Sequence, residues 1–265
     1  MDMNLEGRKV LITGIGEGIG RTLALDFARS GARVAGCARS ENRLSALASE
    51  AEGTGHLFLP ADLTKRDDIQ SLHDRVMEDF GGLDVLVNNV GSIVKMGNFL
   101  EISDQDWQDS FNINLMPAVR LSRLFLPTLK HSGAPRIINI TSIAGSRPGE
   151  MFPHYSAMKA ALSNFTVSLA QTLAPDKILV NSVAPGPVWT RSWVLEAQLA
   201  SQQSGKDLKA MTEEIRSHTA DQVLLKRMGM PEDVSGLVLF LASDRACWIT
   251  GTHFTVDGGV NLNPY

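Results

Sequence analysis

Three residues whose side chains could exchange a proton stand at short spacing in the chain: Ser142, Tyr155 and Lys159. Positions i and i+4 of a helix lie on one face, so the Lys159 ammonium can sit under the Tyr155 phenol. A free phenol titrates near pH ~10, and a neighbouring positive charge should lower the pKa of Tyr155 towards the working range. A serine hydroxyl beside the phenol could polarise a substrate carbonyl. The three residues therefore indicate an acid/base site that interconverts a carbonyl and an alcohol.

So short a pattern also occurs by chance, so its value depends on the elements that position it. Short runs that are apolar at consecutive positions predict strands buried on both faces of a parallel sheet, at Lys9–Thr13, Arg33–Cys37, His56–Leu59, Val85–Asn88, Arg136–Ile140, Leu179–Val183 and His253–Val256. Helical patterns lie between them, at Gly18–Ser30, Glu41–Ala51, Lys65–Phe80, Ser103–Leu129, Tyr155–Thr172 and Glu232–Ala242. This alternation predicts an α/β fold with a doubly wound parallel sheet of about seven strands, in a single domain over residues 1–265.

A polar, helix-prone segment at about 191–228 interrupts the alternation, with helical patterns at Glu196–Gln203 and Asp207–Ser217. A connection of this length inside a compact domain is usually functional, so we expect a lid over the site. A surface insertion without a role is the alternative interpretation.

Composition narrows the class of protein. Hydrophobic residues make up 43% and charged residues 20% of the chain, as in ordinary globular proteins. A net charge of −4 argues against nucleic-acid binding, and no run approaches the ~18 apolar residues of a membrane span. Residues 1–8 carry acids and lack the apolar core of a secretory signal. The two cysteines, Cys37 and Cys247, do not suggest a metal site or a disulfide framework, so the expected setting is a reducing cytoplasm.

A glycine-rich turn, Thr13–Gly20 (TGIGEGIG), follows the first expected strand and opens a helix. Glycines allow a tight turn and close approach of the backbone to a pyrophosphate, whose charge meets the free N–H groups of the helix. The spacing is Gly14-x-x-x-Gly18-x-Gly20 rather than the common G-x-G-x-x-G. Its place between a strand and a helix favours nucleotide binding over a merely flexible turn.

With these motifs in view, the chain resembles the short-chain dehydrogenase/reductase family from about Leu5 to Gly259. The resemblance depends on eight motifs in the family's order, which are TGIGEGIG, ADL at Ala61–Leu63, NNVG at Asn88–Gly91, FNINL at Phe111–Leu115, ITS at Ile140–Ser142, YSAMK at Tyr155–Lys159, PGPVWT at Pro185–Thr190 and DGG at Asp257–Gly259. It implies a Rossmann-type fold, hydride transfer with a nicotinamide nucleotide, and assembly as a homotetramer. Val90 replaces the alanine that is usual at that place, which does not threaten the assignment.

The resemblance also implies the catalytic roles. Ser142 would bind the substrate oxygen, and Tyr155 would give or take its proton. Lys159 would lower the pKa of the tyrosine and hold the nicotinamide ribose. Asn114 would order a helix kink and a water chain to Lys159. A kink also has independent support, because Pro117 lacks an N–H group and should open the helix about one turn earlier.

For the nucleotide, the resemblance assigns Asp62 and the Leu63 backbone to the adenine, Asn89 and Gly91 to the adenosine ribose side, and Val188 and Thr190 to the nicotinamide carboxamide. The cofactor site expected from the motifs thus comprises Gly14, Gly18, Ile19, Gly20, Arg39, Ser40, Asp62, Leu63, Asn89, Gly91, Tyr155, Lys159, Pro185, Gly186, Val188 and Thr190. No metal is expected.

The end of the second strand bears on the choice of nucleotide. Ala38 stands where an acid would bind the 2′-hydroxyl of NAD(H), whereas Arg39 and Ser40 could bind a 2′-phosphate. Glu17 would repel that phosphate unless Arg39 bridges the two or Glu17 turns to solvent. We expect NADP(H), with NAD(H) as the alternative.

The substrate is expected to be small and carbonyl-containing. Its pocket should be largely apolar and should include Gly145, Met151, Phe152, Trp189 and Trp193 beside Ser142 and Tyr155, although ordinary packing also explains such residues. A medium-sized ketone or secondary alcohol fits this pocket better than a sugar. A 3-oxoacyl group on a carrier protein is the nearest alternative, and a nucleotide sensor without catalysis is an alternative of a different class.

Overall fold

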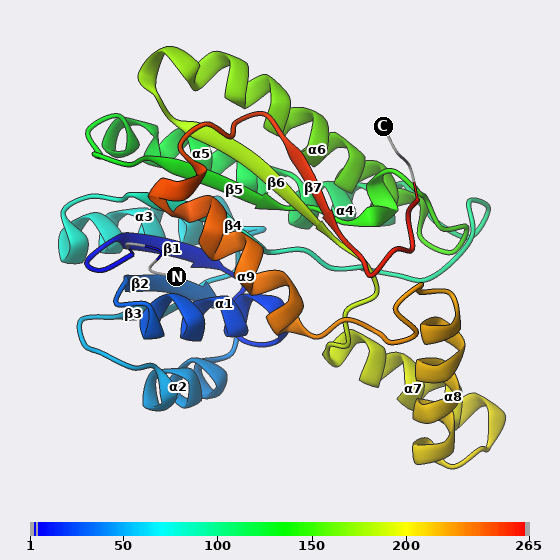
Figure 1. The fold of residues 1–265 in the computed structure, drawn as a ribbon. Coiled ribbons are helices and arrows are strands. Elements are labelled where there is room, and N and C mark those ends of the chain that lie inside the picture. The colour runs from blue at the N-terminus through cyan, green and yellow to red at the C-terminus, as the bar shows by residue number, and fades with distance from the viewer. Residues whose placement is uncertain (1–2, 4, 263–265) are drawn as a thin grey trace.

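The structure, a computed structural model, describes residue 3 and residues 5–262 and contains one seven-stranded sheet. All neighbouring strands are parallel, in the order β3-β2-β1-β4-β5-β6-β7 (Figure 1). The strands are β1 Lys9–Thr13, β2 Arg33–Ala38, β3 Leu57–Pro60, β4 Val85–Asn88, β5 Arg136–Ile140, β6 Leu179–Pro185 and β7 His253–Val256. The predicted doubly wound α/β fold is confirmed, and the order reverses beside β1, where such sheets bind their ligands.

The helices alternate with the strands as predicted. They are α1 Gly18–Arg29, α2 Glu41–Glu50, α3 Arg66–Phe80, α4 Asp104–Asn114, α5 Met116–Leu129, α6 Pro153–Leu173, α7 Arg191–Ser204, α8 Leu208–Asp221 and α9 Pro231–Ala242, with single 3₁₀ turns η1 Ile143–Gly145, η2 Ala174–Asp176 and η3 Asp244–Ala246. The helix expected over Ser103–Leu129 is broken at Leu115, whose φ of −124° is not helical. The break lies just before Pro117, as the missing N–H predicts.

Two apolar layers hold the sheet between the helices. Along β1, Val10 and Ile12 join the core under α1, α2 and α9, whereas Leu11 joins the core under α3, α5 and α6. Successive side chains of a strand point to opposite faces, so a strand buried on both sides must be apolar throughout. This requirement explains the continuous apolar runs from which the strands were predicted.

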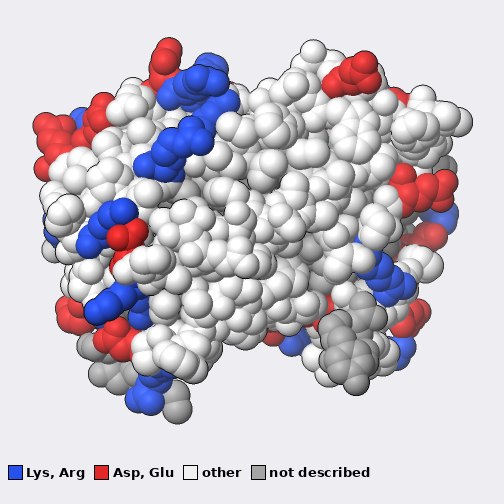
Figure 2. Space-filling model, turned by 90° about the horizontal axis from the view of Figure 1, so that it is seen from above, with Lys and Arg blue, Asp and Glu red and all other residues white. Residues whose placement is uncertain are grey.

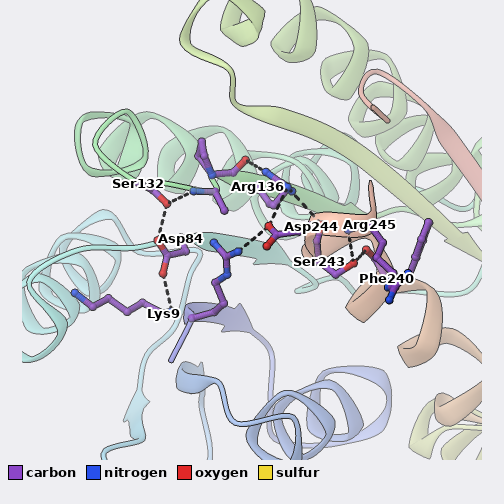
Figure 3. A network of polar contacts seen from close by, with 11 residues as sticks. Lys9, Asp84, Ser132, Arg136, Phe240, Ser243, Asp244 and Arg245 are labelled. Carbon is purple, nitrogen blue, oxygen red and sulfur yellow. Dashed lines mark hydrogen bonds and ion pairs between the residues drawn. The ribbon is translucent and has the colours of Figure 1, made fainter. Parts of the chain in front are cut away.

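A network of polar contacts ties the amino ends of the strands, at the edge opposite the glycine-rich turn (Figure 3). Arg136 begins β5 with 5% of its surface exposed, and it donates to the carbonyls of Pro135 and Ser243 at 3.1 and 3.4 Å. Asp84 accepts from the backbone N–H of Lys9 at 2.9 Å and from the Ser132 hydroxyl. The network joins β1, β4, β5 and the end of α9, so it fixes their relative heights far from the candidate site.

Residues 191–228, where a lid was expected, include two helices, α7 and α8, that pack on each other and extend away from the sheet at the lower right of Figure 1. Few of its side chains are buried, among them Ala197 and Met211. Among the residues that the structure describes, no helix is both long and apolar enough to cross a bilayer.

Candidate active site

The glycine-rich turn is tied to the end of β4 by Thr13. Its hydroxyl accepts from the backbone N–H groups of Asn89 and Val90 at 2.8 and 2.9 Å, and the Asn89 side chain donates to the Thr13 carbonyl at 2.8 Å. Gly20 packs so closely that a Cβ on it would lie 2.2 Å from the Gly14 carbonyl oxygen. The side chain of Asn89, which was expected on the adenosine ribose side, thus stabilises the turn through hydrogen bonds.

The turn leaves room and donors for a dinucleotide. No side chain caps the first turn of α1, so its leading N–H groups, which include those of Ile19 and Gly20, are available to a pyrophosphate. Gly14 and Gly18 have φ values of +74° and +57°, which favour glycine. A Cβ on Gly18 would lie 3.2 Å from Cγ2 of Thr190, so the turn touches the start of the lid. The residues present fit a bound nucleotide.

The adenosine end of this cradle contains the predicted Arg39, Ser40, Asp62 and Leu63. Arg39 is exposed at the end of β2, and Ser40 precedes α2 without capping it. Burial pushes the pKa of Asp62 up, but hydrogen bonds from Thr64 and nearby positive charges, including Arg39, outweigh it and lower the pKa. Asp62 is therefore an ionised acceptor, suited to an adenine amino group.

Glu17 does not pair with Arg39, the partner considered from the sequence. Its Oε2 atom lies 2.6 Å from Nη1 of Arg43, in the first turn of α2, and 3.7 Å from Nε of Arg191, which begins α7. Sequence reasoning missed Arg43, although it stands one helical turn after Arg39. The structure therefore adds a second arginine near the place where a 2′-phosphate was expected.

Ser142, Tyr155 and Lys159 are brought together at the carboxyl ends of the strands, as predicted. The Ser142 side chain lies close enough to Tyr155 to lower the pKa of the phenol. Lys159 is 2% exposed, and its Nζ atom lies 5.7 Å from the centre of the Tyr155 ring. The same Nζ donates to the carbonyl of Ile140, the last residue of β5, at 3.0 Å. The spacing of four residues thus places the amine under the phenol ring.

A buried chain of amides fixes the height of α6 on the sheet. Asn88 of β4 donates from Nδ2 to Oδ1 of Asn139 of β5 at 2.8 Å. Asn139 in turn donates to the hydroxyl of Thr166 of α6 at 2.9 Å. Buried polar groups are costly without partners, so this series of hydrogen bonds favours one position of α6 and of the catalytic side chains on α6.

The acid–base properties differ from the expectation in one respect. Burial lowers the pKa of Lys159 to about 8. Burial also raises the pKa of Tyr155, and the Ser142 side chain only partly offsets this rise. The predicted lowering of the tyrosine pKa by Lys159 is therefore wrong for this structure, because desolvation dominates and the amine faces the ring and the Ile140 carbonyl.

Asn114 lies at the helix break, close to Lys159. Its Nδ2 donates to the carbonyl of Ser92 at 2.9 Å, and its Oδ1 accepts from the Ser92 N–H at 2.9 Å. A Cβ on Gly91 would lie 2.7 Å from Nζ of Lys159 and 3.0 Å from Oδ1 of Asn114. Both polar groups thus face the same small space beside Gly91, where a larger residue would separate them.

The segment after β6 approaches the turn from the other side. Val188 is buried and forms an isolated β-bridge with Gly229. Gly186 lies so close to Asp257 that a Cβ added to the glycine would be 2.5 Å from the Cβ of Asp257. Pro185 ends the buried strand, and Thr190 contacts the glycine-rich turn as described above. The predicted PGPVWT motif is thus placed along the cradle by its packing on the DGG turn.

The predicted substrate residues are only partly brought together. Phe152 meets the Tyr155 ring edge-on, with centroids 6.2 Å apart. Gly145 instead packs against α6, where a Cβ would lie 2.9 Å from the backbone nitrogen of Ala160. Trp189 lies under the guanidinium of Arg216 from α8, 4.9 Å from its ring centre. No described contact joins Met151 or Trp193 to Tyr155.

A hollow of about 730 Å³ opens beside α6. Its lining includes the predicted Gly145 together with Phe99, Leu100 and Ala157, but neither Tyr155 nor Lys159. No cluster of three or more side chains suited to a metal occurs in the described part of the chain.

His154, directly before Tyr155, was missed by sequence reasoning. Its surface is fully buried, neither ring nitrogen has a hydrogen-bond partner among the described residues, and its ring meets Trp107 edge-on at 6.2 Å. Burial lowers the pKa of His154, opposed by Asp106 and assisted by Lys95. A lone histidine next to a tyrosine gives no sequence signal of such burial.

Comparison with known proteins agrees with this architecture. The chain matches, over residues 14–261, the family described as enoyl-(acyl carrier protein) reductase. It is 35% identical to the oxidoreductase YvrD of Bacillus subtilis over 98% of each chain, and 34% identical to the 3-oxoacyl-(acyl-carrier-protein) reductase FabG of Vibrio harveyi over 98% of this chain and 100% of that one. The structure of L-sorbose reductase from Gluconobacter frateurii, complexed with NADPH and L-sorbose, matches with a TM-score of 0.92 and 32% identity over 99% of this chain and 100% of that one.

The chain therefore belongs to the short-chain dehydrogenase/reductase family, as the sequence motifs predicted. It is an oxidoreductase of the NAD(P)-dependent class that acts on CH–OH or ketone groups.

Replacing Gly145 by alanine should lower the free energy of unfolding by about 1–3 kcal/mol, because the new Cβ would be forced against the α6 backbone beside Lys159. Urea denaturation measures the effect. Gly236→Ala is the control, since no heavy atom lies within 4 Å of a Cβ there and alanine suits the interior of α9. Equal stability of the two variants would contradict the close packing.

His154 should make the folded state lose stability as the pH falls from about 7 to 5. The pKa of His154 is lower in the folded state than its ordinary value of 6.5, so the unfolded chain binds the proton first. His154 therefore does not reduce the free energy of unfolding above pH 6.5. Below pH 6.5, and down to the pKa of the folded state, the free energy of unfolding falls by up to about 1.4 kcal/mol per pH unit. His154→Leu should flatten this pH dependence in denaturation experiments.

An unchanged slope between pH 5 and 7 in His154→Leu would show that the buried ring does not titrate with folding.

Proposed function

We propose that this protein interconverts a ketone and a secondary alcohol, with Tyr155 as the general acid and base and with NADP(H) as the preferred nucleotide. The observation that carries the proposal is the placement of Tyr155 beside Ser142 and over the amine of a buried Lys159, at the carboxyl ends of the strands that also carry the glycine-rich cradle. Residues 1–265 would act as one catalytic domain, with residues 191–228 as its lid.

In this proposal each residue has a separate task. The nucleotide, when bound, supplies or accepts the hydride. Ser142 binds the substrate oxygen, and Tyr155 donates a proton to it during reduction or takes one during oxidation. Lys159 holds the nicotinamide ribose through its amine, and Asn114 stays beside it at the helix break. The raised pKa leaves the Tyr155 hydroxyl protonated at neutral pH, as reduction requires, and the lowered pKa of Lys159 allows that amine to exchange protons near neutral pH.

The preference for NADP(H) is supported by three features near the end of β2. Ala38 provides no carboxylate for a ribose 2′-hydroxyl, Arg39 is exposed, and Arg43 lies one turn further along. The L-sorbose reductase whose structure matches this chain is complexed with NADPH. NAD(H) is the alternative, favoured by the carboxylate of Glu17 in the turn.

The proposed substrate is a medium-sized ketone or the matching alcohol. Phe152 against Tyr155 supplies an apolar wall beside the reactive hydroxyl. The relatives named FabG favour a 3-oxoacyl group on a carrier protein as the second candidate. A nucleotide sensor would not need the intact Ser142, Tyr155 and Lys159, and a panel of ketones, 3-oxoacyl thioesters and L-sorbose, followed by NADPH absorbance, separates these possibilities.

We also propose a homotetramer in the cytoplasm, built in part on α6. The surface on the α6 side of the molecule carries a broad area without Lys, Arg, Asp or Glu (Figure 2). Along its 21 residues α6 has one charged side chain of these types, the buried Lys159. Surfaces that lack charge and expose residues such as Val167 favour contact between subunits.

Tyr155→Phe should abolish turnover and leave nucleotide affinity within about twofold, because only the hydroxyl that exchanges the proton is lost. Initial rates with NADPH and the best ketone of the panel measure turnover, and fluorescence titration measures NADPH affinity. More than about a tenth of the native rate in this variant would contradict the acid/base role.

Arg39→Ala should lower the affinity for NADPH about tenfold or more and change the affinity for NADH little, because a guanidinium binds a 2′-phosphate far better than a hydroxyl. Dissociation constants of the two nucleotides test this directly. Arg75→Ala is the control, since it removes an exposed arginine from α3. An equal loss of both nucleotides would mean that Arg39 does not read the 2′ position.

A further inference from the structure

Glu17 stands between two arginines that come from different elements. In the structure its Oε2 atom forms a close ion pair with Arg43 of α2 at 2.6 Å and a looser one with Arg191 of α7 at 3.7 Å. The three side chains are 46%, 36% and 52% exposed, respectively. Ion pairs with this much solvent are weak, so a stronger anion can displace one partner.

The two arginines approach the glycine-rich turn on either side of Glu17. A Cβ on Gly16 would lie 3.1 Å from Cβ of Ala38 and 3.6 Å from Cδ of Arg43, which places Arg43 against the end of β2. Gly18 contacts Thr190, the residue directly before Arg191. Glu17 therefore links the side of the turn where a ribose 2′ group would lie to the first residue of the lid.

The charges favour an exchange of partners. A 2′-phosphate carries more negative charge than a carboxylate and offers three acceptor oxygens, so it competes well for Arg43. It also repels Glu17, whose nearest other cation is Arg191. NADH carries a hydroxyl at this position and leaves the pair of Glu17 with Arg43 intact.

We propose that Glu17 and the 2′-phosphate of NADP(H) compete for Arg43, and that the displaced Glu17 pairs more closely with Arg191. The first turn of α7 is then drawn onto the glycine-rich turn only when a 2′-phosphate is bound. Glu17 is thus a specificity residue that reports the type of nucleotide to the lid. The inference rests on the proposed binding of NADP(H) in this cradle.

The first test measures the dissociation constants of NADPH and NADH by fluorescence titration. Arg43→Gln should raise the dissociation constant of NADPH about tenfold and change that of NADH by less than twofold. Glu17→Gln should lower the dissociation constant of NADPH about threefold, because the competing carboxylate is gone, and should change that of NADH by less than twofold. Glu50→Gln is the matched control, because it removes the same charge from a pair with Arg21 at the far end of α2.

The second test measures hydrogen exchange of residues 191–204 without nucleotide and with saturating NADPH or NADH. In the native protein NADPH should slow exchange there more than NADH does. In Arg191→Gln and Glu17→Gln this difference should disappear, since the link between turn and lid is cut. Both measurements are independent of turnover.

The competing outcomes are distinct. The competition for Arg43 is refuted if Glu17→Gln changes the affinities for NADPH and NADH equally, or if it lowers the affinity for NADPH. It is also refuted if both nucleotides slow hydrogen exchange in α7 equally in the native protein. The proposed ketone reduction is unaffected by these outcomes. If the native protein binds neither nucleotide, the proposed function fails and this inference fails with it.

Discussion

The site depends on one amine that is held in the interior of the fold. Removing an ammonium group from water costs several kcal/mol, which is why the pKa of Lys159 falls to about 8. The structure offsets this cost with the Ile140 carbonyl at 3.0 Å and with the face of the Tyr155 ring. Gly91 leaves the space into which Lys159 and Asn114 both point. Strand end, helix and loop must therefore keep their places for the amine to remain under the phenol.

Much of the fold and the reactive residues could be predicted from the sequence because the signals are local. β1, β4 and β5 have the predicted bounds, since strands buried on both faces need largely apolar runs, and β7 has the predicted bounds although its side chains are only partly buried. β3 starts one residue later than predicted, because Nδ1 of His56 accepts from the N–H of Val34 at 3.1 Å rather than continuing the strand. α6 begins earlier, at Pro153, where the fixed φ of proline suits a first turn.

The rest could not be predicted because it depends on approaches between distant segments. Arg43, and not Arg39, reaches Glu17, since α2 folds back over the glycine-rich turn. The direction of the Tyr155 pKa follows from how deeply the ring is packed, which the spacing to Lys159 does not reveal. Gly145 lines the hollow beside α6 and also packs closely on the α6 backbone, a contact that the motif does not reveal. Whether the pocket residues act on a substrate is likewise outside what spacing can determine.

The stability of the fold is unevenly distributed, and this distribution has a functional meaning. The sheet and its flanking helices share two continuous apolar cores, and the amino ends of β1, β4 and β5 are tied by the buried Arg136 network. Residues 191–228 contribute little to either core, and one contact that joins them to the rest of the chain is that of Arg216 over Trp189. Segments with few buried apolar side chains open at low free-energy cost. The lid that we propose for residues 191–228 could therefore move while the buried Lys159 stays in place.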